Sequence, residues 1–424
     1  AEQLTALSGR ARVTAVVEEP GAVRSPPAGV GLSSPAAVPD ADLDLYELGN
    51  SPAHAYVYRA ALLRPGVVVL HEWSLHHLVL KETVERGDVS SYLREMRRAH
   101  GEVGTFVGRQ VARALGGDLF PALFPLNDRV LESALAIVGL TRFVASRAAR
   151  RLPGHPVLHL PHHVTLPFDP LPSRLEARRA LGLPDDALLV TAPGLATATK
   201  RLDVAIRVLR TLREEFPSMT LVVAGEVDAR LPLAAWLKEA GLEDRAVVTG
   251  RLELPDFVRH LVAADVVLCL RFPSHGEISG ALLRALGVGR PALVTGGTPA
   301  ADEFPEGVVI PVDPGPREDA ELRAFLARLL ADRDFRESVG RVARKHVLAA
   351  HSLAGEVQAL LVFLGEVLGR KGELERALDR DRIPEGTLLG YLMEEVRWGA
   401  RDLGLPGVQL GLEPLLLELT RGKT

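Results

Sequence analysis

The stretch of sequence that decides the fold is LRFPSHGEISGALLRALGVGRPALV, residues 270–294. An apolar run at residues 264–270, typical of a buried strand, leads into it, and a second apolar run begins at Pro291. Between the two runs lie a polar loop and a helix whose apolar face comprises Leu282, Leu283 and Leu286. In parallel α/β sheets, ligands bind at loops that follow the carboxyl ends of strands, and the free N–H groups of the next helix favour an anion. The stretch therefore predicts an anion-binding loop in an α/β fold.

Length and composition restrict the class of protein. A chain of 424 residues is too long for one ordinary core, so we expect two domains. Its 47% hydrophobic residues are typical of a soluble globular protein, and its net charge of −4 gives no general reason to bind nucleic acid. The one cysteine, Cys269, lies in an apolar run and is expected in the core, which favours a reducing compartment. No uncharged run is long enough to span a membrane and no signal peptide opens the sequence, so we expect a cytoplasmic protein.

Short apolar strands alternate with helices along the whole chain, which predicts parallel, doubly wound sheets. The first residues, AEQLTALSGR, read as the end of a helix before the strand pattern ARVTAVV, so we infer that a preceding strand and loop are missing. In the first half we expect strands at residues 44–48, 67–70, 134–139 and from Val157, and helices at 53–63, 89–115 and 141–151. The segment PHHVTLPFDPLP, residues 161–172, reads as a linker because it has four prolines and little periodicity.

The second half shows the same alternation. We expect strands at residues 187–191, 219–224, 246–249, 264–270, from Pro291 and near Val308, and helices at 202–216, 232–240, 255–263, from Gly280, and from Asp319, Asp334 and Ser352. The predicted organisation is a Rossmann-like N-terminal domain at 1–165, a Rossmann-like C-terminal domain at 166–352, and a helical extension at 353–424 whose first helix crosses back to the N-terminal domain. A cleft between two such domains is the expected active site.

Several ordered motifs resemble those of the retaining glycosyltransferases of family four. That family's donor loop, a Glu followed by Gly-Phe-Gly and a helix that ends in Gly-Lys-Pro, is similar to Glu277, Ser279, Gly280 and residues 289–291. Its phosphate-binding strand end is similar to Gly194 and Lys200-Arg201. The segments LGNSPAHA (48–55) and VLHEWSLHH (69–77) are similar to a bacterial subgroup whose donor loop reads Gly-Glu-Thr-Ser-Gly. The resemblance implies the GT-B fold, with two facing Rossmann-like domains.

The resemblance also implies a reaction, in which a sugar moves from a nucleotide diphosphate to an unidentified acceptor. Negative charge builds on the leaving diphosphate, and Lys200, Arg201 and the helix start at Gly280 would stabilise it. Glu277 would hold the sugar hydroxyls, and His71 would lie near the donor sugar and the acceptor. The predicted catalytic residues are thus His71, Lys200 and Glu277. The predicted donor-binding residues are Gly194, Lys200, Arg201, Arg251, Glu277, Ile278, Ser279, Gly280 and Arg284, and neither a metal nor another cofactor is expected.

Structural roles are the alternative for each of these residues. Lys200 and Arg201 could be a solvated first turn of a helix, Glu277 a helix cap, and His71 a hydrogen-bonded histidine at a strand end. His162 and His163 are interpreted as linker residues rather than metal ligands, because no third ligand accompanies them at a recognisable spacing. The acidic DADLD at 40–44 precedes a strand and reads as a solvated turn.

Two substitutions and the missing first strand depart from the family pattern. Ala285 stands where the family has a second Glu that binds the ribose, and Leu195 stands where it has a basic residue after Gly194. The alternative function is therefore a sugar-nucleotide-binding or scaffold protein with little or no turnover. An NAD-dependent enzyme fits less well, because no G-x-G-x-x-G follows a strand. Beyond about residue 370, short amphipathic helices are expected to pack on the chain, on a second copy or on a membrane surface.

Overall fold

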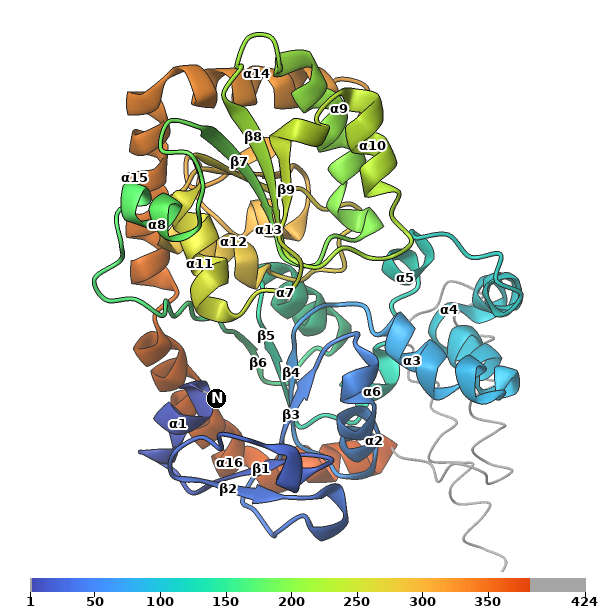
Figure 1. The fold of residues 1–424 in the computed structure, drawn as a ribbon. Coiled ribbons are helices and arrows are strands. Elements are labelled where there is room, and N and C mark those ends of the chain that lie inside the picture. Colours follow the sequence, from blue (N-terminus) through green and yellow to red (C-terminus); the bar gives the residue numbers. More distant parts are fainter. Residues whose placement is uncertain (1, 382–424) are drawn as a thin grey trace, which may run out of the picture. The chain divides into compact units, whose positions relative to one another are not determined.

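The structure, a computed structural model, describes residues 2–381 in two compact units (Figure 1). Unit 1 comprises Ala1–Pro39, Gly139–Arg147 and Leu158–Phe363. Unit 2 comprises Asp40–Val138, Ala148–Val157 and the chain from Leu364. These bounds differ from the predicted domain limits, because the first 39 residues group with the second half of the sequence. The amphipathic helices predicted beyond residue 381 lie outside the described residues.

Contacts made by the first helix explain why the N-terminal segment belongs to unit 1. Gln3 Nε2 donates to Glu356 Oε1 at 3.1 Å, and Arg10 Nη1 lies 3.4 Å from Gln358 Oε1. The segment contributes its own two-stranded parallel sheet, in which Val13 lies opposite Val30. Its elements are α1 (Glu2–Ser8), β1 (Val13–Val16), a 3-10 turn at Pro20–Ala22, β2 (Val30–Ser33) and a second 3-10 turn at Pro35–Ala37.

The main sheet of unit 1 has six parallel strands in the order β12-β11-β10-β7-β8-β9. Each central strand is a run of buried aliphatic residues, as expected for a parallel sheet that helices cover on both faces. The predicted strands are all present, with small differences at their ends. Their bounds are β7 (Leu188–Pro193), β8 (Met219–Ala224), β9 (Ala246–Val248), β10 (Val266–Cys269), β11 (Ala292–Thr295) and β12 (Ile310–Val312).

Two separate apolar cores flank this sheet. Helices α9, α10 and α14 cover one face, and α8, α11, α12 and α15 cover the other (Figure 1). The sequence pattern had not predicted α8, which a capping box begins: Ser173 Oγ accepts from Glu176 N, and the Glu176 carboxylate accepts from Ser173 N. The helices are α8 (Arg174–Ala180), α9 (Leu202–Leu212), α10 (Leu233–Ala240), α11 (Leu254–Ala263), α12 (Gly280–Gly287), α13 (Pro299–Asp302), α14 (Glu318–Ala331) and α15 (Arg333–Ala350), with 3-10 turns at Ala198–Lys200 and Glu243–Arg245.

Unit 2 is built on a four-stranded sheet in the order β3-β4-β5-β6. Its predicted strands are confirmed as β3 (Leu45–Leu48), β4 (Val67–Leu70), β5 (Ala136–Gly139) and β6 (Val157–His159). The helices are α2 (Ala55–Leu63), α3 (His76–Glu82), α4 (Val89–Ala112), α5 (Phe120–Leu123), α6 (Asp128–Glu132) and α7 (Arg142–Arg151), with 3-10 turns at Pro52–His54 and Val84–Arg86.

The helical segments predicted at residues 89–115 are confirmed as the two halves of α4. Gly101 has φ 61° and ψ −148°, a conformation open to glycine but not to other residues, and it lies between the two helical halves of α4. Gly104 follows closely: a Cβ on it would lie 2.1 Å from the carbonyl oxygen of Met96. The position of the break was not predicted, because helical periodicity on both sides of a glycine does not reveal a change of direction.

The last described helix, α16 (Leu353–Asp381), follows α15 after two residues. By length and composition alone, the stretch Arg333–Leu378 could cross a membrane. A third of its most apolar 18-residue segment is buried. One helix nevertheless ends at Ala350 and a new helix begins at Leu353. The stretch also contains the buried carboxylate of Glu356. Core helices of soluble proteins have the same length and apolar composition, so these two features do not distinguish a membrane span from a core helix.

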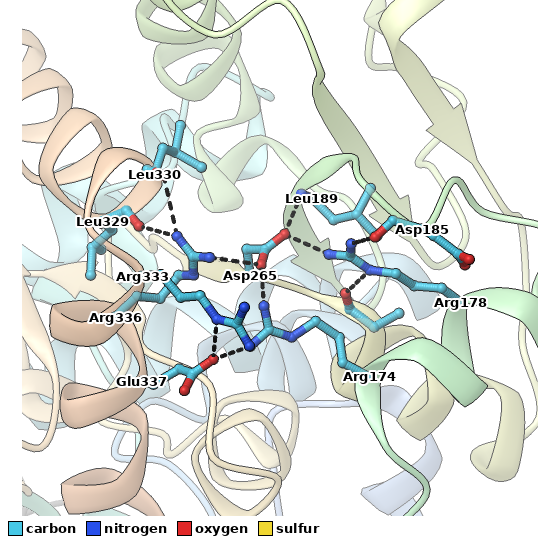
Figure 2. A network of polar contacts seen from close by, with 11 residues as sticks. Arg174, Arg178, Asp185, Leu189, Asp265, Leu329, Leu330, Arg333, Arg336 and Glu337 are labelled. Carbon is cyan, nitrogen blue, oxygen red and sulfur yellow. Dashed lines mark hydrogen bonds and ion pairs between the residues drawn. The ribbon is translucent and has the colours of Figure 1, made fainter.

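A buried carboxylate joins the two central strands at their amino ends. Asp265, directly before β10, accepts a hydrogen bond of 2.8 Å from Leu189 N in β7 (Figure 2). Three arginines surround the same carboxylate: Arg174 at 2.7 Å and Arg178 at 2.6 Å from α8, and Arg336 at 3.4 Å from α15. Asp265 is only 2% exposed, so these contacts hold α8 and α15 against the edge of the sheet through charges that water cannot screen.

We predict that Asp265→Ala destabilises the protein by about 3–5 kcal/mol, because it leaves several buried guanidinium groups without their anion. The exposed pair of Arg179 and Asp185 provides a control, with side chains 66% and 48% exposed. Asp185→Asn should cost less than about 1 kcal/mol. Urea denaturation of both variants measures the difference, and equal unfolding midpoints would contradict the role of Asp265.

Candidate functional site

The strand order places a site at the carboxyl ends of β7 and β10. From β7 the chain continues to β8 and β9 on one side, and it returns to form β10 and β11 on the other side. Such a topological switch point leaves a crevice between the loops that follow the two central strands, where open α/β sheets bind ligands. Here the loop after β7 carries Gly194 and Lys200, and the loop after β10 carries Glu277. Phe272 N donates to Thr199 O at 2.8 Å and joins the two loops.

Gly194 makes close packing possible at the end of β7. Its φ of 84° lies in the left-handed region, and a Cβ there would lie 2.9 Å from Lys200 Nζ. Gly225, at the end of β8, packs so closely that a Cβ on it would lie 2.5 Å from Gly194 O. Glycine at these two positions thus lets the strand ends and Lys200 pack closely where the sequence predicted a phosphate contact.

Lys200 is a cation held in a largely buried position. Its ammonium donates to Pro193 O, and burial lowers its pKa from the ordinary 10.5 to about 8, with Arg271 lowering it further and Cys269 acting in the opposite direction. Among the described residues, no carboxylate lies within ion-pair distance of Lys200. The alternative of a solvated first turn is therefore wrong for Lys200: a buried cation without a counter-ion is costly unless a ligand supplies one.

Arg201 has a structural partner. It caps α9 with φ 53°, and its guanidinium forms an ion pair with the buried Glu318 at the start of α14. Its Cζ also lies 5.7 Å from the centre of the Phe272 ring. The guanidinium of Arg201 already has an anionic partner in Glu318. The predicted contact of Arg201 with a phosphate stays a prediction.

Glu277 is fixed by hydrogen bonds from its own loop. Its Oε1 accepts from Arg271 Nη1 at 2.7 Å, and its Oε2 accepts from His275 N at 2.7 Å and from Ser274 Oγ at 3.2 Å. The side chain is 16% exposed. Because a carboxylate has about four acceptor positions, these three bonds orient Glu277 and leave capacity for a further donor.

Ser279, rather than Glu277, caps the following helix. Its Oγ accepts from Leu282 N at 3.3 Å, so the alternative role of Glu277 as the cap of α12 is wrong. Ile278 packs partly buried against the core under α12. The amide groups at Gly280 begin the helix in the position that the sequence predicted.

The side chain of Arg284 folds back and binds the backbone of its own helix. Its Nη1 donates to Gly280 O at 3.0 Å, burial lowers its pKa, and its Nε is buried without a partner among the described residues. Its neighbour Ala285 is fully buried in the core. The structure therefore provides no carboxylate at the position of the family's second Glu.

The two remaining predicted residues, Arg251 and His71, belong to other segments of the chain. Arg251 is exposed after the edge strand β9, and β8 separates β9 from β7. His71 follows β4 in unit 2, where its Nε2 lies 2.6 Å from Glu47 Oε2. This contact fits the alternative of a hydrogen-bonded strand-end histidine, although His71 keeps 38% of its side chain exposed.

Arg271 is the residue that the sequence reasoning missed. It lies two residues after β10, pairs with Glu277, and donates from its backbone N to Thr295 Oγ1 at 2.9 Å, which joins the loop to the end of β11. Its position just beyond a predicted strand and six residues before Glu277 was the available signal. Cys269, by contrast, is a core thiol as predicted, since burial raises its pKa to about 11.

Comparison with known proteins identifies the domain that carries these loops. Residues 173–346 match the family model described as Glycosyl transferases group 1. Alpha-D-kanosaminyltransferase of Streptomyces kanamyceticus is 28% identical over 185 residues, which are 43% of this chain and 46% of that protein. D-inositol 3-phosphate glycosyltransferase of Saccharomonospora viridis is 31% identical over 187 residues, 41% of this chain and 42% of that protein. The chain thus spans less than half the length of these curated relatives.

The solved structure of WaaG, a glycosyltransferase involved in lipopolysaccharide biosynthesis, shows the same fold. It matches with a TM-score of 0.53 at 16% identity, over 82% of this chain and 90% of that one. The predicted fold class is confirmed: α/β of the GT-B type, with parallel sheets and a helical C-terminal stretch.

We predict that Lys200→Met makes the protein more stable at pH 7, by about 1–3 kcal/mol, because it removes the penalty of burying a cation. Between pH 8 and 10.5 the unfolded chain binds a proton at Lys200 that the folded protein has released, so wild-type stability should rise with pH there. The variant should lack this rise. Urea denaturation from pH 7 to 10.5 measures both effects, with Lys238→Met at an exposed position as the control. A loss of stability in Lys200→Met would contradict the assignment.

Proposed function

From the group 1 glycosyltransferase domain at residues 173–346, we propose that this chain transfers a sugar from a nucleotide diphosphate donor to an acceptor. The observation that carries the proposal is that a largely buried cation without a carboxylate partner, Lys200, and a fixed carboxylate, Glu277, lie in the two hydrogen-bonded loops at the switch point of the sheet. The cation matches the diphosphate of such a donor, and the carboxylate matches its sugar. We further propose that the reaction retains the anomeric configuration, as in family four.

Lys200 supplies what a leaving diphosphate requires. The departing group gains negative charge, and a cation already desolvated by the protein stabilises that charge more strongly than a hydrated one. Gly194 leaves room for Lys200 Nζ, and the N–H groups at the start of α12 can donate to the same oxygens. No metal ion is invoked for this step.

Glu277 supplies the complementary end of the site. Arg271 and the backbone N–H of His275 hold the carboxylate in place, so it can accept hydrogen bonds from sugar hydroxyls without reorganising. Because Glu277 lies in the loop before α12, the sugar and the diphosphate would bind next to each other in this proposal. For His71, which belongs to unit 2, the role near the acceptor stays a prediction.

A second candidate function follows from Ala285 and Leu195. A buried alanine and an exposed leucine offer neither the carboxylate for the ribose nor the extra cation for the phosphates, and Arg284 is bonded to its own helix. These features favour a sugar-nucleotide-binding protein with weak or absent turnover. Hydrolysis of the donor in the absence of acceptor separates the two functions, because only a catalyst releases the nucleotide.

The expected context of the reaction is cytoplasmic and bacterial. A single cysteine, partly buried against the core, and two relatives from bacteria support this proposal. The partners would be a nucleotide diphosphate sugar and an acceptor, without nucleic acid. A contact of the C-terminal helices with a membrane surface or a second copy stays a prediction, since it concerns residues beyond 381.

We predict that Lys200→Met and Glu277→Gln each lower donor turnover by about 10²–10³-fold while the protein stays folded. Calorimetry with UDP-, GDP- and ADP-sugars first selects the donor, and a donor-hydrolysis assay or transfer to acceptor extracts then measures turnover. The exposed Lys238→Met and Glu306→Gln serve as matched controls. Near-normal turnover in both site variants would refute the site, and donor binding without any turnover in the wild type would favour the second function.

We also predict that the affinity for the selected nucleoside diphosphate falls as pH rises through about 8, where the free protein loses the Lys200 proton. The decline approaches tenfold per pH unit, because binding then requires uptake of that proton. In Lys200→Arg any remaining affinity should be flat from pH 7 to 10, since a guanidinium stays charged. Titration calorimetry at four pH values compares the two proteins. A flat wild-type profile would show that Lys200 does not bind the diphosphate.

A further inference from the structure

Two adjacent linker histidines lie beside a buried carboxylate in unit 1. His162 and His163 approach Glu356, in the first turn of α16, so that one nitrogen from each ring and one carboxylate oxygen all lie within 4.8 Å of one another. His163 Nδ1 forms a short hydrogen bond with Glu356 Oε2, and His162 Nδ1 lies 3.9 Å from Glu356 Oε1. Glu356 follows His163 by 193 residues, which explains why the sequence showed no third ligand.

We propose that His162, His163 and Glu356 bind one divalent transition-metal ion, for which Zn²⁺ is the best match. Two imidazoles and one carboxylate are a recognised ligand set for zinc, and they leave the fourth tetrahedral position to water. Mg²⁺ and Ca²⁺ prefer oxygen ligands and fit this set poorly. The proposal is independent of the glycosyltransferase activity, because none of the three residues belongs to the loops after β7 and β10.

The positions of the donor atoms suit a small metal ion. Two ligand atoms on one tetrahedral zinc ion lie about 3.3 Å apart, given bonds of about 2.0–2.1 Å. The three donor atoms already lie within 4.8 Å of one another, so modest side-chain rotations bring them to one ion. The linker backbone is already fixed beside the carboxylate, since His163 N donates to Glu356 Oε2 at 2.9 Å.

A second layer of contacts orients these ligands. The other nitrogen of His163, Nε2, lies 3.4 Å from Glu2 Oε2, and Thr165 Oγ1 donates to the same carboxylate oxygen. A histidine that binds a metal through one nitrogen usually donates a hydrogen bond to a carboxylate through the other. Gln3 Nε2 also donates to Glu356 Oε1 at 3.1 Å. Such outer contacts are what a metal site needs and what a chance meeting of histidines lacks.

The burial of Glu356 requires a positive partner in either case. Its side chain is 2% exposed, and an isolated carboxylate at such a position would be strongly disfavoured. A protonated His163 could neutralise it, which is the metal-free alternative. His162 and His163 both lie beside the carboxylate in the metal-free protein, so a direct measurement of metal binding separates the two cases.

A bound ion would fasten three segments of unit 1 that are distant in sequence. His162 and His163 belong to the linker, and Glu356 lies in the first turn of α16. Glu2, in α1, contacts His163. Metal binding should therefore stabilise the folded protein, because the site forms only when these segments meet.

The test uses the full chain, freed of any affinity tag and of metal by chelation, with Zn²⁺ alone as the probe. Calorimetry should show one tight site per chain, and Zn²⁺ should raise the melting temperature whereas Mg²⁺ should not. His162→Ala should weaken Zn²⁺ binding by at least about tenfold, and Glu2→Gln should weaken it by about tenfold through the outer layer. His346→Ala, a histidine of α15 outside the cluster, should bind like the wild type.

Equal Zn²⁺ affinity in the wild type and in His162→Ala would overturn the proposal, as would the absence of a saturable site in the wild type. If Glu356→Gln fails to fold, the comparison of His162→Ala with His346→Ala still decides the question. A visible absorption spectrum of four-coordinate Co²⁺, lost in His162→Ala, would support the site by a second measurement.

Discussion

The pairing of β7 with β10 is the interaction on which the rest of unit 1 depends. At the amino ends of these strands, Asp265 accepts from Leu189 N and neutralises part of a ring of arginines from α8 and α15. At the carboxyl ends, the chain diverges into the loop of Lys200 and the loop of Glu277. Because the strands are parallel and adjacent, whatever holds their amino ends together also brings the two loops to one place.

The two ends of this strand pair use charge in opposite ways. At the amino edge, opposite charges meet directly, and the contacts stabilise the fold without needing a ligand. At the carboxyl edge, Lys200 is desolvated and lacks a carboxylate partner among the described residues, whereas Glu277 has its own loop as partner. The desolvated charge of Lys200 thus lowers the stability of the ligand-free protein, and an anionic ligand would neutralise this charge. This asymmetry, rather than the presence of charged residues alone, separates a binding site from a structural ion-pair network.

Elements with strong local signals were predictable from the sequence, and contacts between distant residues were not. Aliphatic runs such as the one at 219–224 located the strands within a residue or two, and the Glu277–Gly280 loop was recognised from its residues. The break of α4 at Gly101 and the arginine ring around Asp265 depend on three-dimensional packing that no periodicity encodes. Arg271 was missed for a related reason: its role appears only when its side chain is seen to reach Glu277. The contact of His163 with Glu356 is the extreme case, because 193 residues separate the two in the sequence.

The central claim is that the ends of β7 and β10 bind the diphosphate of a sugar nucleotide. A crystal structure of the full chain with the nucleoside diphosphate that binds best tests it most directly. The account predicts diphosphate oxygens within hydrogen-bond distance of Lys200 Nζ and of the amide groups at the start of α12. A nucleotide bound elsewhere, with Lys200 still donating to Pro193 O and no ligand near Gly280, would contradict it.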